Sequence, residues 1–247
     1  MEEALVTCRI ADHVALVMLN HPARRNAFSL AMEAQLRTTL EAAARDPQVR
    51  VIVLSAAGDT FCVGGEVADL QHSGRDLPIA PAGAEGIETN YARRFSYILG
   101  LDRPIIAAIN GSVAGIGFVL CMYCDLRYMV DDARLSTSFA RLGLVAEQGT
   151  AWMLPRLIGP MNALDLLLTA RAVPAAEAAQ MGLVRTLPRA DFLERVLAEA
   201  RRIAAGCSPR STRIIRRQVY DGLFQSLAQS YQAGEQQERD SFASADH

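Results

Sequence analysis

Two nearly continuous apolar segments constrain the fold of this chain more than any other feature. Val49 to Ala56 and Ile105 to Asn110 are rich in Val, Ile, Leu and Ala, which is typical of strands buried on both faces of a sheet. Ala15 to Asn20 predicts a further strand. A helix is expected between these strands, because Ser29 can cap LAMEAQLRTTLEAAARD and Asp46-Pro47 ends it. The order strand, helix, strand predicts an α/β core.

The length and composition fit one core with an appendage. The chain has 247 residues, of which 51% are hydrophobic and only 6% aromatic, so the core is expected to consist of Ala, Leu, Val and Ile. From Asp191 onward the sequence is polar with a helical pattern. We therefore predict a core over residues 1–190 and a helical region over 191–247, with arginines in exposed positions: Arg201, Arg202, Arg210, Arg213, Arg216 and Arg217.

Charge and residue usage exclude several classes of function. The net charge of −2 and the pI near 6.1 argue against a nucleic-acid partner. All 25 basic residues are arginine, which excludes chemistry that needs a lysine amine, such as a Schiff base or a P-loop. The longest apolar runs fall short of the ~20 residues needed to cross a membrane. Five unevenly spaced cysteines and the absence of a signal-like start predict a cytoplasmic protein.

Two glycine-rich turns follow predicted strands. One covers Thr60 to Leu70, and the other covers Asn110 to Phe118 and opens into a predicted helix. Glycine lets a backbone approach a ligand closely, and the first N–H groups of a helix are free to donate. A single Gly-x-Gly string is more often a structural turn. The two turns together indicate a site for an oxyanion.

Four motifs in order carry a resemblance to a known family: HPARRNAF, FCVGGEVADL, INGSVAGIGFVLCMYCDLR and LGLVAEQGTAWMLPRLIG. Over nearly its whole length the chain resembles the enoyl-CoA hydratase/isomerase (crotonase) family. The resemblance implies a spiral of ββα units and an acyl-CoA thioester as substrate, with coenzyme A as part of that substrate and no separate cofactor. It also implies a homotrimer or a dimer of trimers, joined through the C-terminal helices.

The resemblance also implies roles for individual residues. The backbone N–H groups of Val63 and Ile116 would form an oxyanion hole that polarises the thioester carbonyl and stabilises an enolate. Coenzyme A would lie near Asn26 and Ala27, with Arg24 as a cationic contact. The glycines expected to shape the site are Gly64, Gly65, Gly115 and Gly117.

The candidate acids depart from those of the hydratases. Val119 and Phe139 stand where that branch carries its two glutamates, whereas Glu147 stands where enoyl-CoA isomerases carry a lone Asp or Glu. One carboxylate is enough to move a proton from C2 to C4 of a 3-enoyl thioester. Phe139 and Leu142 are expected to bind substrate and, with Val119 and Trp152, to provide apolar surroundings that raise the pKa of Glu147.

Several alternatives stay open at this point. The same enolate-stabilising site could serve hydration, hydrolysis or decarboxylation, and a non-catalytic CoA-binding scaffold is the alternative outside enzymes. Glu147 could instead cap a helix that begins near Gln148, and Glu66 and Asp69 could assist or merely cap. Asp125 is interpreted as structural. Residues 72–98 and the C-terminal helices are expected to wall the acyl pocket, and Cys121-x-x-Cys124 lacks the further ligands of a metal site.

Overall fold

The fold is built on a six-stranded sheet. The structure, a computed structural model, describes residues 4–66 and 87–244. The strand order is β1-β2-β3-β5-β7-β10, in which only β1 and β2 pair antiparallel. The α/β prediction is confirmed, and each predicted strand is present within two residues of its expected bounds. The strands are β1 (Val6–Ala11), β2 (Val14–Leu19), β3 (Val51–Ala56), β5 (Ile105–Ile109), β7 (Leu126–Val130) and β10 (Arg185–Leu187).

A second, smaller sheet of four short strands lies beside the first. Its order is β4 (Thr60–Cys62), β6 (Ser112–Ala114), β8 (Arg134–Ser136) and β9 (Val173–Pro174). β4, β6 and β8 are parallel, and each follows a strand of the main sheet after a tight connection. Treating residues 60–62 and 112–114 as parts of turns was therefore wrong. Three residues are too few for an alternating pattern to be visible in a sequence.

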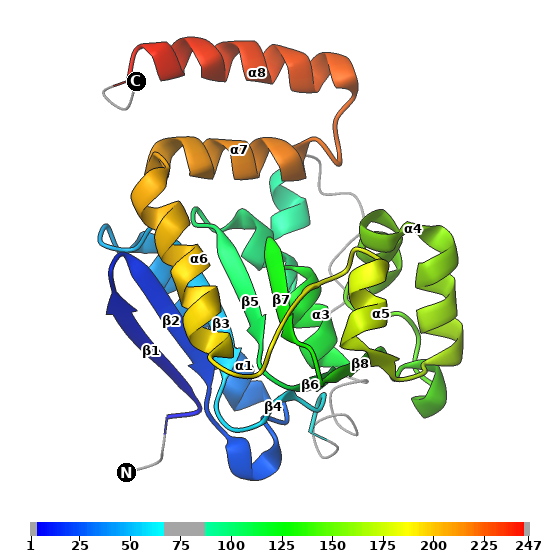
Figure 1. Cartoon of the computed structure of the whole chain (residues 1–247). Coiled ribbons are helices and arrows are strands. Elements are labelled where there is room, and N and C mark those ends of the chain that lie inside the picture. The colour runs from blue at the N-terminus through cyan, green and yellow to red at the C-terminus, as the bar shows by residue number, and fades with distance from the viewer. Residues whose placement is uncertain (1–3, 67–86, 245–247) are drawn as a thin grey trace.

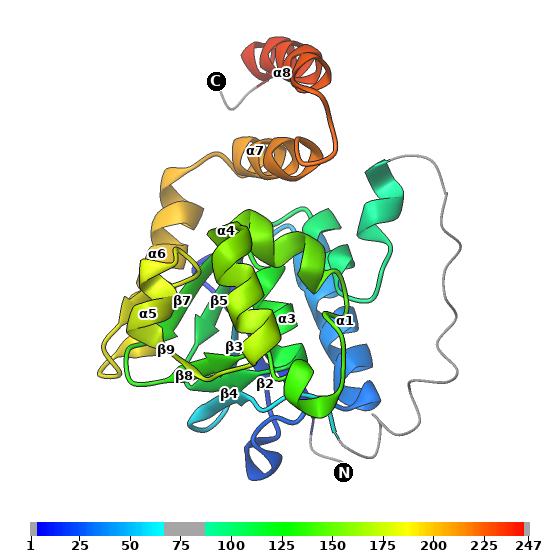
Figure 2. The same cartoon turned by 90° about the vertical axis from the view of Figure 1, so that its right-hand side faces the viewer.

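Two helices cover opposite faces of the main sheet (Figures 1 and 2). α1 (Leu30–Arg45) begins as predicted, because the Ser29 side chain accepts a hydrogen bond from the Met32 N–H. α6 (Phe192–Gly206) covers the other face and buries Val196 and Ala200 completely. The central strands β3 and β5 are consequently buried along their whole length, as their apolar sequences predict.

The remaining helices surround the second sheet and the top of the core. α4 changes direction at Gly159, where φ is 77°, and Pro160 follows. No helix in the described ranges is long and apolar enough to cross a bilayer. The elements are η1 (Pro22–Arg24), η2 (Ile87–Tyr91), η3 (Ser96–Gly100), α3 (Ile116–Met122), η4 (Ala140–Leu142), α4 (Thr150–Thr169), α5 (Ala175–Gln180), α7 (Pro209–Asp221) and α8 (Leu227–Phe242).

A buried ion pair fastens α7 to the core. α7 lies across the top of the main sheet, and α8 runs back along it (Figure 1). The Arg216 Nε lies 2.9 and 2.8 Å from the two Asp125 carboxylate oxygens, and the guanidinium also donates to three backbone carbonyls of residues 98–101. The prediction that Arg216 is exposed was wrong, because these acceptors satisfy its charge inside the protein. The structural interpretation of Asp125 is confirmed.

Replacing Asp125 by Ala is expected to destabilise the protein by about 3–5 kcal/mol, because Arg216 is then left buried without its counter-charge. Urea unfolding at fixed protein concentration measures the change. Asp132→Ala is the control, since its ion pair with Arg189 is exposed, and it should leave the unfolding midpoint nearly unchanged. Equal midpoints for the two variants would contradict a supporting role for the buried pair.

Candidate active site

The two glycine-rich turns meet in space. β4 pairs in parallel with β6, so the chain leaves both strands at the same edge of the small sheet. A Cβ atom built on Gly115 would lie 3.6 Å from the Gly64 Cα, and one built on Gly64 would lie 3.6 Å from the Ala114 carbonyl oxygen. Both glycines have positive φ angles, of 52° and 111°. The backbone conformation and the close approach together favour glycine at these positions.

The meeting turns bring the two predicted donors to one edge of the small sheet. Ile116 is the first residue of α3, so its N–H has no acceptor within the helix. The Val63 N–H donates to the Arg25 carbonyl at 3.3 Å, which is long for such a hydrogen bond. A ligand oxygen at this position would therefore find one donor that has no acceptor among the described residues and one that is weakly engaged.

α3 packs directly against β4. A Cβ atom on Gly117 would lie 2.6 Å from the Cβ and 2.8 Å from the Sγ of Cys62, distances that real side chains essentially never show. Burial raises the pKa of the Cys62 thiol to about 11, so this cysteine is a neutral packing group and not a nucleophile. The contact fixes the position of the α3 N-terminus relative to Val63.

The HPARRNAF segment is held against the first turn. The buried Asn26 amide donates to the carbonyls of Ala57 and Thr60 and accepts from the His21 N–H. Asn26 is thus a scaffold residue, a role that the sequence analysis missed. Its left-handed backbone, with φ of 53°, is one that Asn adopts more readily than most residues.

The predicted coenzyme A contacts flank this segment. Ala27 is half-buried beside Phe28, whose N–H donates to the Gly64 carbonyl at 2.8 Å and which pairs with Gly65. The Arg24 side chain is 63% exposed and lies 3.6 Å from the Glu66 carboxylate. It is therefore accessible to a phosphate group. Asp69 lies outside the described residues.

Glu147 lies in the connection between η4 and α4. Its backbone carbonyl accepts from the N–H and the hydroxyl of Thr150, at 2.9 and 2.5 Å. The carbonyl of the next residue, Gln148, accepts from the Tyr123 hydroxyl at 2.7 Å. The half-buried Glu147 carboxylate has no hydrogen bond or ion pair with any residue in the described ranges. α4 begins at Thr150 behind Gly149 and has no side-chain cap, so the capping alternative for Glu147 was wrong.

The side chains expected to provide apolar surroundings for Glu147 differ in burial. Val119 and Phe139 are buried, at 1% and 5% exposure, and Trp152 is half-buried. Leu142, however, is 64% exposed, because η4 turns its side chain outward. The expectation that Leu142 shares an apolar wall with Phe139 was therefore wrong for this conformation of the chain.

A cavity of about 490 Å³ is lined by the two residues that follow Glu147 in the chain. Its wall includes these two residues, Gln148 and Gly149, and Phe224 from the connection between α7 and α8. The Phe224 ring stacks on Trp152, with ring centroids 5.0 Å apart. Several of the lining residues belong to the segment 72–98 that is expected to wall an acyl pocket, of which residues 72–86 lie outside the described residues. The full lining is Thr89, Asn90, Arg93, Phe95, Ser96, Leu99, Tyr123, Gln148, Gly149, Trp152, Met153 and Phe224.

Known proteins resemble this chain over most of its length. The family model "Enoyl-CoA hydratase/isomerase" matches residues 9–247. A Thermus thermophilus protein whose name contains "enoyl-CoA hydratase" is 36% identical over 209 residues, which cover 82% of this chain and 78% of the relative. The Rattus norvegicus mitochondrial Delta(3,5)-Delta(2,4)-dienoyl-CoA isomerase is 33% identical over 216 residues, 85% of this chain and 65% of the relative. The crystal structure of a Mycobacterium marinum enoyl-CoA hydratase is 35% identical with a TM-score of 0.73, covering 88% of this chain and 98% of that one.

Gly117→Ala is expected to destabilise the protein by about 1–3 kcal/mol, because the added methyl group overlaps Cys62. Gly206→Ala is the matched control, since a Cβ atom there meets nothing within 4 Å and alanine favours a helix. Urea unfolding of both variants measures the difference. If Gly117→Ala were as stable as Gly206→Ala, the close packing of α3 on β4 would be contradicted.

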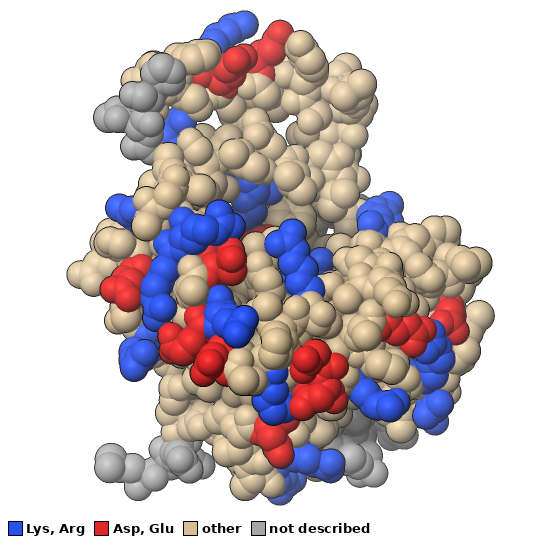
Figure 3. Space-filling model, in the orientation of Figure 1, with Lys and Arg blue, Asp and Glu red and all other residues tan. Residues whose placement is uncertain are grey.

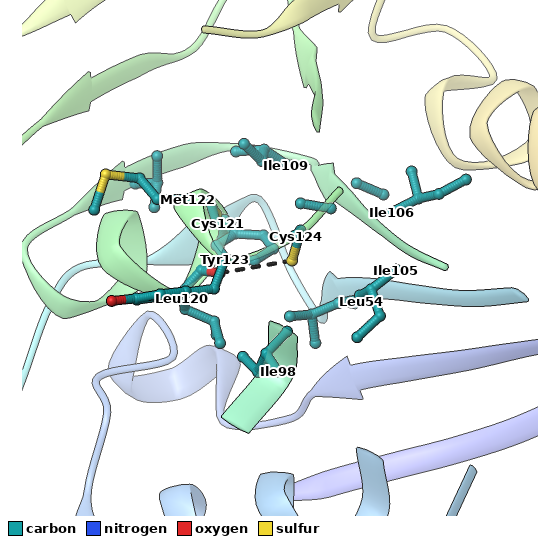
Figure 4. Close-up of a cluster of buried hydrophobic side chains, with 14 of the residues drawn as sticks. Leu54, Ile98, Ile105, Ile106, Ile109, Leu120, Cys121, Met122, Tyr123 and Cys124 are labelled. Atoms are coloured by element: carbon teal, nitrogen blue, oxygen red, sulfur yellow. Dashed lines mark hydrogen bonds between the residues drawn. The ribbon is translucent and has the colours of Figure 1, made fainter. Parts of the chain in front are cut away.

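The cysteines are expected to differ sharply in reactivity towards a disulfide reagent at pH 8. Cys8 and Cys207 are exposed and should react in the native protein, whereas Cys62, Cys121 and Cys124 are buried. Figure 4 shows Cys121 and Cys124 among apolar side chains, and burial raises the pKa of Cys124 to about 12. Fewer thiolates form when the pKa is raised, so these three should react only after unfolding. A third rapid equivalent, or rapid reaction in a Cys8→Ser/Cys207→Ser variant, would contradict this assignment.

Proposed function

Because this chain belongs to the enoyl-CoA hydratase/isomerase family, we propose that it moves the double bond of an enoyl-CoA from position 3 to position 2, with Glu147 as the proton carrier. The observation that carries the proposal is the half-buried Glu147 carboxylate, which has no hydrogen-bond or ion-pair partner among the described residues and directly precedes two residues, Gln148 and Gly149, that line a cavity. Val119 and Phe139 are both buried and cannot transfer protons. Of the positions 119, 139 and 147, only Glu147 carries a group that can transfer a proton, and one such group is sufficient for isomerisation.

The reaction uses the two oxyanion donors, the N–H groups of Val63 and Ile116, together with the Glu147 carboxylate. The thioester oxygen accepts hydrogen bonds from the Ile116 N–H and from the Val63 N–H, which gives up its long bond to Arg25. These donors stabilise the negative charge that develops on oxygen when Glu147 removes the proton from C2. The electrons of the dienolate then take the same proton at C4, and the double bond ends between C2 and C3. Each oxyanion donor typically contributes about 3 kcal/mol to the transition state.

Hydration of a 2-enoyl-CoA is the second candidate. Relatives at similar identity include proteins named as hydratases and as a dienoyl-CoA isomerase, so the family alone leaves the reaction open. Hydration needs one group to activate water and another to protonate C2. The buried Val119 and Phe139 supply neither group, which favours isomerisation. Hydrolysis, decarboxylation and CoA binding without catalysis remain as outcomes that the experiment below separates.

Assembly as a homotrimer or a dimer of trimers is part of the same proposal. α8 packs along α7 and leaves Leu227, Tyr231 and Phe242 between 63% and 84% exposed. Figure 3 shows few charged side chains over the upper part of the molecule, where α7 and α8 lie. Apolar residues exposed in this way favour association. The five unpaired cysteines support a cytoplasmic location.

Glu147→Gln is expected to lower the rate of conversion of 3-enoyl-CoA to 2-enoyl-CoA by a factor of about 10²–10⁴ while KM changes little, because the amide cannot accept the C2 proton. A spectrophotometric assay of the conjugated product measures the rate. Glu66→Gln is the matched control, since the only ion pair of the Glu66 carboxylate among the described residues is with the exposed Arg24, and it should keep most of the activity. Hydration of 2-enoyl-CoA that survives in Glu147→Gln would indicate that another acid carries the proton. Tight binding of CoA by the wild type without any turnover would favour the non-catalytic CoA-binding scaffold.

A further inference from the structure

The cavity that Gln148 and Gly149 line has both apolar and polar residues in its lining. The apolar ones are Trp152 and Met153 of α4, Phe224 of the C-terminal connection, Phe95 and Leu99. Most of the polar ones come from residues 89–96. The polar members are Thr89, Asn90, Arg93, Ser96 and Gln148. Binding sites commonly combine an apolar surface with a few convergent polar groups that fix the orientation of the ligand.

Three of the polar side chains in the lining have no polar partner in the described ranges. Asn90, Arg93 and Gln148 make no side-chain hydrogen bond or ion pair with any residue that the structure describes. Arg94, the next residue after Arg93, is by contrast bound to the Glu33 carboxylate through its Nε at 2.7 and 2.9 Å. Adjacent arginines thus have different surroundings. Arg94 binds the segment before η3 to α1, whereas Arg93 lines the cavity and its guanidinium has no partner among the described residues.

The described lining of the cavity carries positive charge without any negative charge. Arg93 is the only charged residue among the described residues that line it, and no Asp or Glu is present in that lining. A plain alkyl end in this cavity would displace water from three polar side chains without replacing the lost hydrogen bonds, which is unfavourable. A carboxylate would accept a charge-assisted hydrogen bond from the guanidinium and further bonds from the two amides.

We propose that this cavity selects acyl groups whose far end carries a carboxylate, and that Arg93 is the residue that determines this specificity. The placement of the thioester, with its reacting carbons at Glu147 and its far end in the cavity, rests on the proposed function. Glu147 directly precedes Gln148 in the chain, and Gln148 and Arg93 both line the cavity. The proton transfer and the selection of the acyl end therefore use different residues of one site.

The test uses the fluorescence of Trp152, which is the only tryptophan of the chain and lines the cavity. The full-length protein is titrated with hexanoyl-CoA and with hexanedioyl-CoA, which differ only in the terminal carboxylate. We expect the dicarboxylic thioester to bind about tenfold more tightly to the wild type. Arg93→Met should remove this preference. Arg195→Met, which deletes an exposed arginine of α6 outside the cavity, should keep it.

Equal affinities of the wild type for the two thioesters, or a preference that survives in Arg93→Met, would overturn the proposal. Both ligands are saturated and contain no double bond to move, so their binding does not depend on catalysis by Glu147. A protein that fails to isomerise 3-enoyl-CoA but shows the Arg93-dependent preference would refute the proposed function alone. Loss of the preference with intact isomerisation would refute the specificity alone.

Discussion

The close approach of two backbone turns is the constraint on which the rest of this structure depends. The turns after β4 and β6 touch at Gly64 and Gly115, and Gly117 brings α3 against Cys62. The short parallel pairing of β4 with β6 holds both turns in register. Since backbone atoms are in contact there, the N–H groups of Val63 and Ile116 are placed by the main chain. Their positions are consequently insensitive to the identity of the side chains at 63 and 116.

The C-terminal region is coupled to the cavity through buried polar contacts. Arg216 joins α7 to Asp125 in the core, and the Tyr91 hydroxyl donates to the Asp221 carboxylate at 2.5 Å. These contacts place Phe224 against Trp152 at the cavity wall. A region that the sequence marks as a polar helical appendage therefore completes the site. Residues more than a hundred positions apart in the chain become neighbours through one ion pair and its carbonyl partners.

The segment around Glu147 combines a fixed backbone with a free carboxylate. Thr150 and Tyr123 hold the carbonyls of Glu147 and Gln148, and Gln148 adopts a left-handed conformation with φ of 52°. Such conformations are costly for a residue other than glycine and persist where surrounding contacts impose them. The hydrogen bonds here are made by the backbone carbonyls. The side chains of residues 147 and 148 have no polar partner among the described residues and can therefore contact a ligand.

The sequence by itself determined the α/β class, the central strands, the capped helix α1 and the two glycine turns. These features are local: apolar runs, an N-cap and glycine positions can be read within a few residues. Only the tertiary structure decided that Arg216 is buried, that Asn26 is a scaffold, that Leu142 faces outward and that Phe224 walls the cavity. Each of these depends on partners distant in the chain, such as the Asp125 carboxylate for Arg216, and no local pattern encodes which distant group will satisfy a buried charge or fill a space.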